Sequence, residues 1–126
     1  MRIPCFTKDY DVKIPQETGI PGVFNLKARQ TVTIEPNQSE HYSTGLVIQM
    51  PKGHVLLVQE HAYLKNLNVT VQPFFIAHGF VQELIVKITN NSDKLFFTVP
   101  AEMLLTMVIL LTPSASNNEF YVEGVR

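Results

Sequence analysis

The sequence predicts an all-β fold with little or no helix. Apolar residues recur at every second position rather than with the 3.6-residue period of a helix. In segment 84–89, Leu84, Val86 and Ile88 share one face of the expected strand, while Lys87 and Thr89 share the other. Short turn-forming segments also interrupt the chain at close intervals. Many short strands with such turns between them are typical of a β-sandwich or a β-barrel.

Each expected strand is rich in Val, Ile, Leu, Phe or Thr, which suit a pleated, half-buried surface. The expected strands are 31–34, 45–50, 55–58, 69–72, 84–89, 95–99 and 103–111. Turns rich in Pro, Gly, Asn or Ser are expected at 36–39, 51–53, 77–79, 90–93 and 113–118. The one helical candidate is a turn or two near 61–64. Residues 119–122 have strand character, and we expect them either to pair with a neighbouring subunit or to fold back on their own sheet.

The composition limits the possible functions. A chain of 126 residues fits one domain, 1–126, with an N-terminal segment at 1–19 and a C-terminal arm at 112–126. A net charge of −1 provides no electrostatic surface for nucleic acid or for an anionic membrane. The apolar run 103–111 is far shorter than the ~20 residues of a membrane-spanning helix. We therefore expect neither nucleic acid nor a membrane as a partner.

The cysteine and histidine residues suggest no redox or metal chemistry. Cys5 is the only cysteine, which excludes an internal disulfide. Asp9 and Asp11 fall where a signal peptide needs an apolar stretch, so we expect an intracellular protein. The four histidines match no metal-ligand spacing; they are His41, His54, His61 and His78. No metal and no cofactor is predicted.

Several stretches resemble, in order and spacing, the trimeric dUTP pyrophosphatase (dUTPase) family. They include Thr44-Gly45-Leu46, the turn 90–94 and the strand 103–111, and the resemblance covers residues 20–111. It implies a distorted jelly roll of the dUTPase type, also called a β-clip. It also implies a homotrimer whose active sites are shared among subunits and whose C-terminal strand crosses to a neighbour.

The first two motifs of the resemblance differ from the enzymes at their charged positions. Asn25 stands where the family has an Asp that helps to arrange the magnesium site. The replacement removes a carboxylate of the kind that Mg²⁺ prefers as a ligand. Gln59, Glu60 and His61 stand where the enzymes have Pro-Arg-Ser. Glu60 therefore replaces the arginine and reverses the charge that faces a triphosphate.

The remaining motifs have also lost their reactive groups. Ala77 replaces the catalytic Asp, and removing a general base typically costs ~10²–10⁴ in rate. Phe80 keeps the aromatic platform of the Tyr that packs under the deoxyribose. Met103 and Thr106 replace the Arg and the Gln of the fourth motif. Nothing between Leu110 and Arg126 matches the glycine-rich fifth motif.

We therefore predict a catalytically inactive dUTPase relative that acts as a protein-interaction module. The resemblance extends to adenoviral early-region and herpesviral dUTPase-related proteins, which implies a viral protein directed at host signalling proteins in the cytoplasm or nucleus. One alternative is a nucleotide-binding protein or a weak hydrolase of dUTP or another deoxynucleotide, with a remodelled pocket. Another is a structural role, as in a trimeric capsid-like jelly roll.

Three smaller hypotheses accompany these. His78 is either a substitute base beside Ala77 or a turn histidine, and we favour the turn. Glu60 and His61 are not expected to form an acid–base pair, because adjacent strand residues point to opposite faces. Of Phe74, Phe75 and Phe80, two are expected to pack in the core.

Overall fold

The computed structural model describes residues 1–10, 12–98, 103–110 and 118–125, and these form an all-β fold. The strands are β1 (Arg2–Thr7), β2 (Gln16–Glu17), β3 (Val23–Lys27), β4 (Thr33–Ile34), β5 (Ser39–Ser43), β6 (Leu46–Ile48), β7 (Val55–Glu60), β8 (Val69–Val71), β9 (Phe74–Ala77), β10 (Ile85–Asn90), β11 (Phe97–Thr98), β12 (Met103–Leu110) and β13 (Glu119–Val125). Within the described residues, the only helix is the 3₁₀ helix η1 (Ala62–Leu67). The described part of the chain holds no helix whose length and hydropathy would let it cross a membrane.

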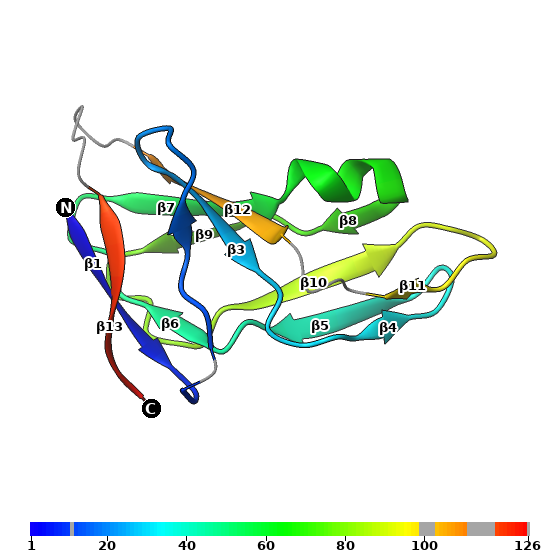
Figure 1. Cartoon of the computed structure of the whole chain (residues 1–126), viewed down its shortest axis with the longest axis horizontal. Helices are drawn as coiled ribbons and strands as arrows, with labels where there is room; N and C mark the ends of the chain where they lie inside the picture. Colours follow the sequence, from blue (N-terminus) through cyan, green and yellow to red (C-terminus); the bar gives the residue numbers. More distant parts are fainter. Residues whose placement is uncertain (11, 99–102, 111–117, 126) are drawn as a thin grey trace.

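The strands form one large antiparallel sheet and three smaller sheets. The large sheet has the order β2-β3-β12-β7-β9, and the others are β13-β1-β6, β5-β10-β8 and β11-β4. Neighbours in these sheets are mostly distant in sequence, as in a jelly roll. The terminal strands β1 and β13 lie at one end of the molecule, and η1, β8 and the loop between β10 and β11 lie at the other (Figure 1).

A single apolar core joins the sheets. Leu84, Val86 and Ile88 are buried while Ile85 and Lys87 are exposed, so the predicted alternation in this strand is confirmed. The same alternation along β3, β7 and β12 turns every second side chain of the large sheet inward.

The termini join the same core. Phe24 on β3 and Phe120 on β13 pack edge to face with ring centroids 4.7 Å apart, which ties the terminal strand to the large sheet.

Several predicted strands are shorter than their apolar runs. Only Thr33–Ile34 of 31–34 and Leu46–Ile48 of 45–50 form strand. Gly45 has φ +76°, outside the β region, so the strand begins after it. In the expected strand 95–99, only Phe97–Thr98 forms a strand. Residue 99, residue 111 of the expected strand 103–111, and residues 113–117 of the expected turn 113–118 lie outside the described residues. The run 103–111 is a strand from Met103 to Leu110 as predicted, and Leu104, Leu105 and Met107 are buried.

Other elements are longer than predicted or were not predicted. β7 continues through Glu60, and the helical turn expected near 61–64 is η1, which runs to Leu67. The sequence analysis missed β1, β2, β3, β5 and β9; β5, for example, is polar and buries only Tyr42. The turn expected at 77–79 begins one residue later, because Ala77 ends β9. β13 pairs in parallel with β1 of its own chain, which is the second of the two alternatives for the C-terminal segment.

Candidate functional site

Three of the residues that the sequence analysis singled out, Asn25, Gln59 and Thr106, form one row across the large sheet. Thr106 on β12 pairs with Asn25 on β3 on one side and with Gln59 on β7 on the other. All three side chains are half-buried on the face opposite the core, because the residues on both sides of Asn25 and Thr106, and Val58 before Gln59, are buried. The Thr106 hydroxyl donates a hydrogen bond to Asn25 Oδ1 at 3.3 Å. Met103 begins β12 opposite Lys27, further along the same sheet. This row has polar groups but no carboxylate.

The two residues that follow Gln59 bind the protein's own backbone. Glu60 Oε1 accepts a hydrogen bond from the Val71 N–H at 3.2 Å, which joins the end of β7 to β8. His61 is not on the strand, contrary to the expectation that it would alternate with Glu60. It is the N-cap of η1, and its Nδ1 accepts a hydrogen bond from the Tyr63 N–H at 3.1 Å. Both side chains therefore have structural roles.

The third motif lies at the far end of the sheet. Ala77 is the last residue of β9 and pairs with Val55, so its methyl group has no ionisable strand partner. His78 Nδ1 lies 3.2 Å from the Met50 carbonyl oxygen, as suits a turn histidine. Phe80 and Phe74 pack edge to face with centroids 5.4 Å apart, and both contact the core, whereas Phe75 is 60% exposed. The prediction that two of these three phenylalanines pack in the core is confirmed.

The motifs do not meet within one chain. Val55, the partner of Ala77, and Gln59, the partner of Thr106, are four residues apart on β7. At about 3.3 Å per strand residue, the Ala77 position lies roughly 13 Å from the polar row. A pocket within one chain that used both regions would have to span that distance.

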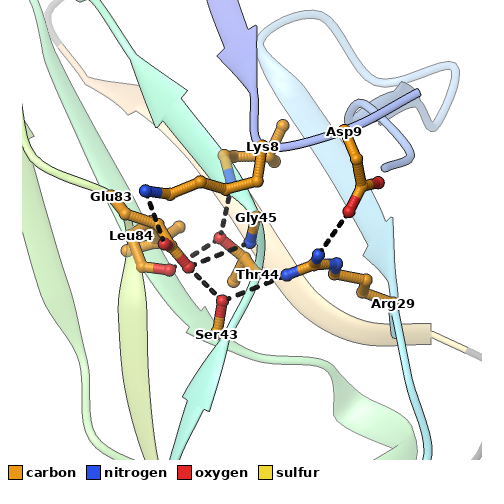
Figure 2. Close-up of polar contacts among 9 residues, drawn as sticks. Lys8, Asp9, Arg29, Ser43, Thr44, Gly45, Glu83 and Leu84 are labelled. Carbon is orange, nitrogen blue, oxygen red and sulfur yellow. Dashed lines mark hydrogen bonds and ion pairs between the residues drawn. The ribbon is translucent and has the colours of Figure 1, made fainter. Parts of the chain in front are cut away.

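A network of polar side chains centred on Glu83 was missed by the sequence analysis. Figure 2 shows Glu83 facing Ser43, Gly45 and Lys8. Glu83 accepts a hydrogen bond from the Ser43 hydroxyl and one from the Gly45 N–H at 3.2 Å, and its other oxygen lies 3.6 Å from Lys8 Nζ.

The network extends from Ser43 to the end of β1. Arg29 donates to the Ser43 hydroxyl at 3.3 Å and forms an ion pair with Asp9 at 2.6 Å (Figure 2). Thr44 donates to the Leu84 carbonyl at 2.7 Å. The network joins the end of β1, the segment after β3, the β5–β6 turn and the segment before β10. Its one signal in the sequence was Glu83 itself, which ends the third-motif stretch 75–83.

Replacement of Glu83 by alanine is expected to lower the free energy of unfolding by about 2 kcal/mol, because it leaves polar partners of a mostly buried carboxylate unpaired. The matched control is Glu119→Ala, which breaks the exposed ion pair between Arg2 and Glu119. We expect that change to cost less than about 1 kcal/mol, as exposed pairs generally do. Urea unfolding of both variants provides the comparison, and equal losses would show that the network adds nothing beyond a surface pair.

The described residues offer little for metal or nucleophilic chemistry. Among them, no group of three or more His, Cys, Asp or Glu side chains is placed to hold a metal ion. Cys5 is buried on β1, and burial raises the pKa of its thiol to about 12. The thiol is therefore protonated at neutral pH and is a poor nucleophile.

These features define a jelly-roll-like, all-β protein, and the solved structures that share its fold are dUTPases. No protein-family model matches the chain, and no curated protein sequence is similar to it. Among solved structures, the dUTPase of Staphylococcus bacteriophage 80alpha has a TM-score of 0.77 at 15% identity, covering 94% of this chain and 97% of that one. A mutant dUTPase from phage phi11 of S. aureus has a TM-score of 0.77 at 14% identity, covering 91% and 95%. A mutant 80alpha dUTPase with dUpNHpp has a TM-score of 0.75 at 16% identity, covering 94% and 97%.

Proposed function

We propose that this chain is a catalytically inactive, dUTPase-related viral protein that works as a protein-interaction module directed at host signalling proteins, in the host cytoplasm or nucleus. The observation that carries the proposal is Ala77. A methyl group stands at the position of the catalytic acid, opposite an apolar strand partner. General base catalysis needs a titratable group within hydrogen-bond reach of the attacking water.

The other replaced positions support the same proposal. Glu60 puts a carboxylate where an anionic triphosphate needs a cation, and that carboxylate binds the Val71 N–H instead. Asn25 and Thr106 bind each other. By contrast, Glu83 is kept, and its partners are all parts of the scaffold. This pattern is expected if folding is still needed and hydrolysis is not.

We further propose that the chain forms a homotrimer. The outward row Val23–Val108–Leu57–Phe75 crosses the large sheet in register, and each of these side chains is half-buried or exposed. An apolar row of this kind on a sheet face is typical of a surface that another protein covers. The separation of about 13 Å between the motifs within one chain also favours an arrangement in which copies face each other.

A regulatory role has a precedent among proteins of this fold. Phage dUTPases are described as controlling the transfer of virulence genes by a proto-oncogenic G protein-like mechanism. For our chain, control through protein contacts would require the scaffold and its surfaces but not the hydrolysis.

The second candidate function is nucleotide binding, with or without weak hydrolysis. It is favoured by Phe80, an aromatic side chain held against Phe74 at the position of the deoxyribose platform. It is also favoured by the fold's similarity to a mutant phage dUTPase whose structure was solved with dUpNHpp. Packing of a deoxyribose on an aromatic platform does not need the catalytic acid.

Calorimetric titration with dUTP and Mg²⁺ tests the proposal. We expect no saturable heat up to millimolar dUTP, equivalent to a binding free energy no stronger than about −4 kcal/mol. Saturable heat that disappears in Phe80→Ala would favour nucleotide binding. Continuing heat flow in proportion to protein concentration would mean turnover, and the inactive assignment would then be wrong.

A further inference from the structure

The end of the molecule farthest from the termini carries exposed apolar side chains. Leu95 is 72% exposed and Phe96 is 62% exposed, in the loop between β10 and β11, and Leu67 at the end of η1 is 39% exposed. These three residues, here called the tip surface, border a hollow of about 360 Å³. The loop and η1 lie at the same end of the molecule in Figure 1. Neighbouring large apolar side chains that remain in water commonly mark a binding surface.

The backbone beneath the tip surface is held rigidly. The buried Asn90 side chain donates hydrogen bonds to the carbonyl oxygens of Leu95 at 2.8 Å and Ile34 at 3.0 Å, and accepts one from the Ser92 N–H at 3.0 Å. The Ser92 hydroxyl accepts bonds from the N–H groups of Lys94 and Leu95.

Two backbone hydrogen bonds also connect this loop to neighbouring segments. The Asn37 N–H binds the Ser92 carbonyl at 3.0 Å, and the Asn91 N–H binds the Asn68 carbonyl at 2.9 Å. The exposed side chains are therefore presented by an ordered loop, which lowers the entropic cost of binding.

The polar groups around the hollow indicate what it would accept. Its lining contains no acidic or basic side chain, but Lys65 and Lys94 each directly precede a lining residue and are exposed. The nearest acid in sequence, Asp93, accepts a hydrogen bond from the Asn37 amide at 3.2 Å. The exposed amides of Asn66 and Asn68 also line the hollow and can bind a peptide backbone. The surface thus combines an apolar contact, backbone-binding amides and flanking positive charge.

We propose that the tip surface binds an extended peptide segment of a partner protein, with one large apolar side chain in the hollow and a carboxylate within a few residues of it. The apolar side chain packs against Leu67, Leu95 and Phe96, and the carboxylate pairs with Lys65 or Lys94. This inference rests on the proposed function, because it assigns a binding face and a partner chemistry to the interaction module.

A selection from a displayed library of random linear peptides tests this inference. Peptides retained by the wild-type chain are expected to share a Leu, Phe, Met or Trp close to an Asp or Glu. The double variant Leu95→Ser/Phe96→Ser should weaken the best synthetic peptide by about 30-fold or more, as loss of a hot-spot contact does. Lys94→Glu should weaken the same peptide by about tenfold and reduce the salt dependence of its binding. Tyr10→Ser is the matched control and should leave binding unchanged, because Tyr10 is 92% exposed and follows β1, which lies at the end of the molecule opposite the tip surface (Figure 1).

Each result that contradicts the proposal would overturn a different part of it. Peptides that bind the double variant as tightly as the wild type would overturn the tip surface while leaving the interaction module standing. A basic or wholly polar consensus, or no enriched peptide, would overturn the partner chemistry. If Leu95→Ser/Phe96→Ser alone reduces the size of the assembly in sedimentation, the occupant is a second copy of the chain. Thermal unfolding monitored by circular dichroism should show that the variants fold, since all the changed side chains are exposed.

Discussion

Replacement of Asn90 by alanine is expected to lower the free energy of unfolding by about 3 kcal/mol, because it removes three hydrogen bonds from a side chain that is 1% exposed. The carbonyl oxygens of Ile34 and Leu95 would lose this donor where little water can replace it. Asn90 joins the end of β10 to β4 and to the loop before β11, so the loss would loosen three segments together. Urea unfolding at equilibrium measures the effect.

The matched control is the next residue. Asn91 is exposed, and its side chain donates one bond, to the Thr70 hydroxyl at 3.3 Å. Asn91→Ala is therefore expected to cost less than about 0.5 kcal/mol, the usual range for surface changes. Similar losses in the two variants would mean that the buried amide contributes no more than an exposed one.

Replacement of Gly45 by alanine is expected to cost about 3 kcal/mol, because positive φ and close packing both disfavour a side chain there. Gly45 has φ +76°, and an added Cβ would lie 2.7 Å from Val12 Cγ2 and 3.1 Å from Arg29 Cδ. Arg29 cannot move away freely, because it binds both Ser43 and Asp9. The alanine would thus disturb the Glu83 network as well as the backbone.

Gly53 provides the control for backbone strain alone. It also has positive φ, +86°, but nothing lies within 4 Å of an added Cβ. Gly53→Ala should therefore lower the free energy of unfolding by only about 1 kcal/mol, which is the cost of placing an alanine at positive φ. The difference between the two thermal unfolding curves isolates the packing at Gly45. If the two variants lose the same stability, close approach to Val12 and Arg29 does not matter.

Part of the candidate site was predictable from the sequence because it concerns residue types. A methyl group at position 77 cannot accept a proton in any environment, and a carboxylate at position 60 cannot act as an arginine. The structural roles of Glu60 and His61 were not predictable, because they depend on which backbone N–H groups lie beside them. Val71 follows Glu60 only after η1 has intervened, and the cap at His61 required knowing where η1 begins.

The sequence by itself determined the all-β class, the inward face of 84–89 and the side-chain types that stand at positions 25, 60 and 77. These follow from local periodicity, turn chemistry and side-chain type. Only the tertiary structure decided that β13 pairs with β1, that the network around Glu83 joins four segments, and that Ala77 and Thr106 lie far apart in one chain. These depend on strand register and on contacts between distant segments. Periodicity states which face of a strand is apolar but not which strand lies beside it.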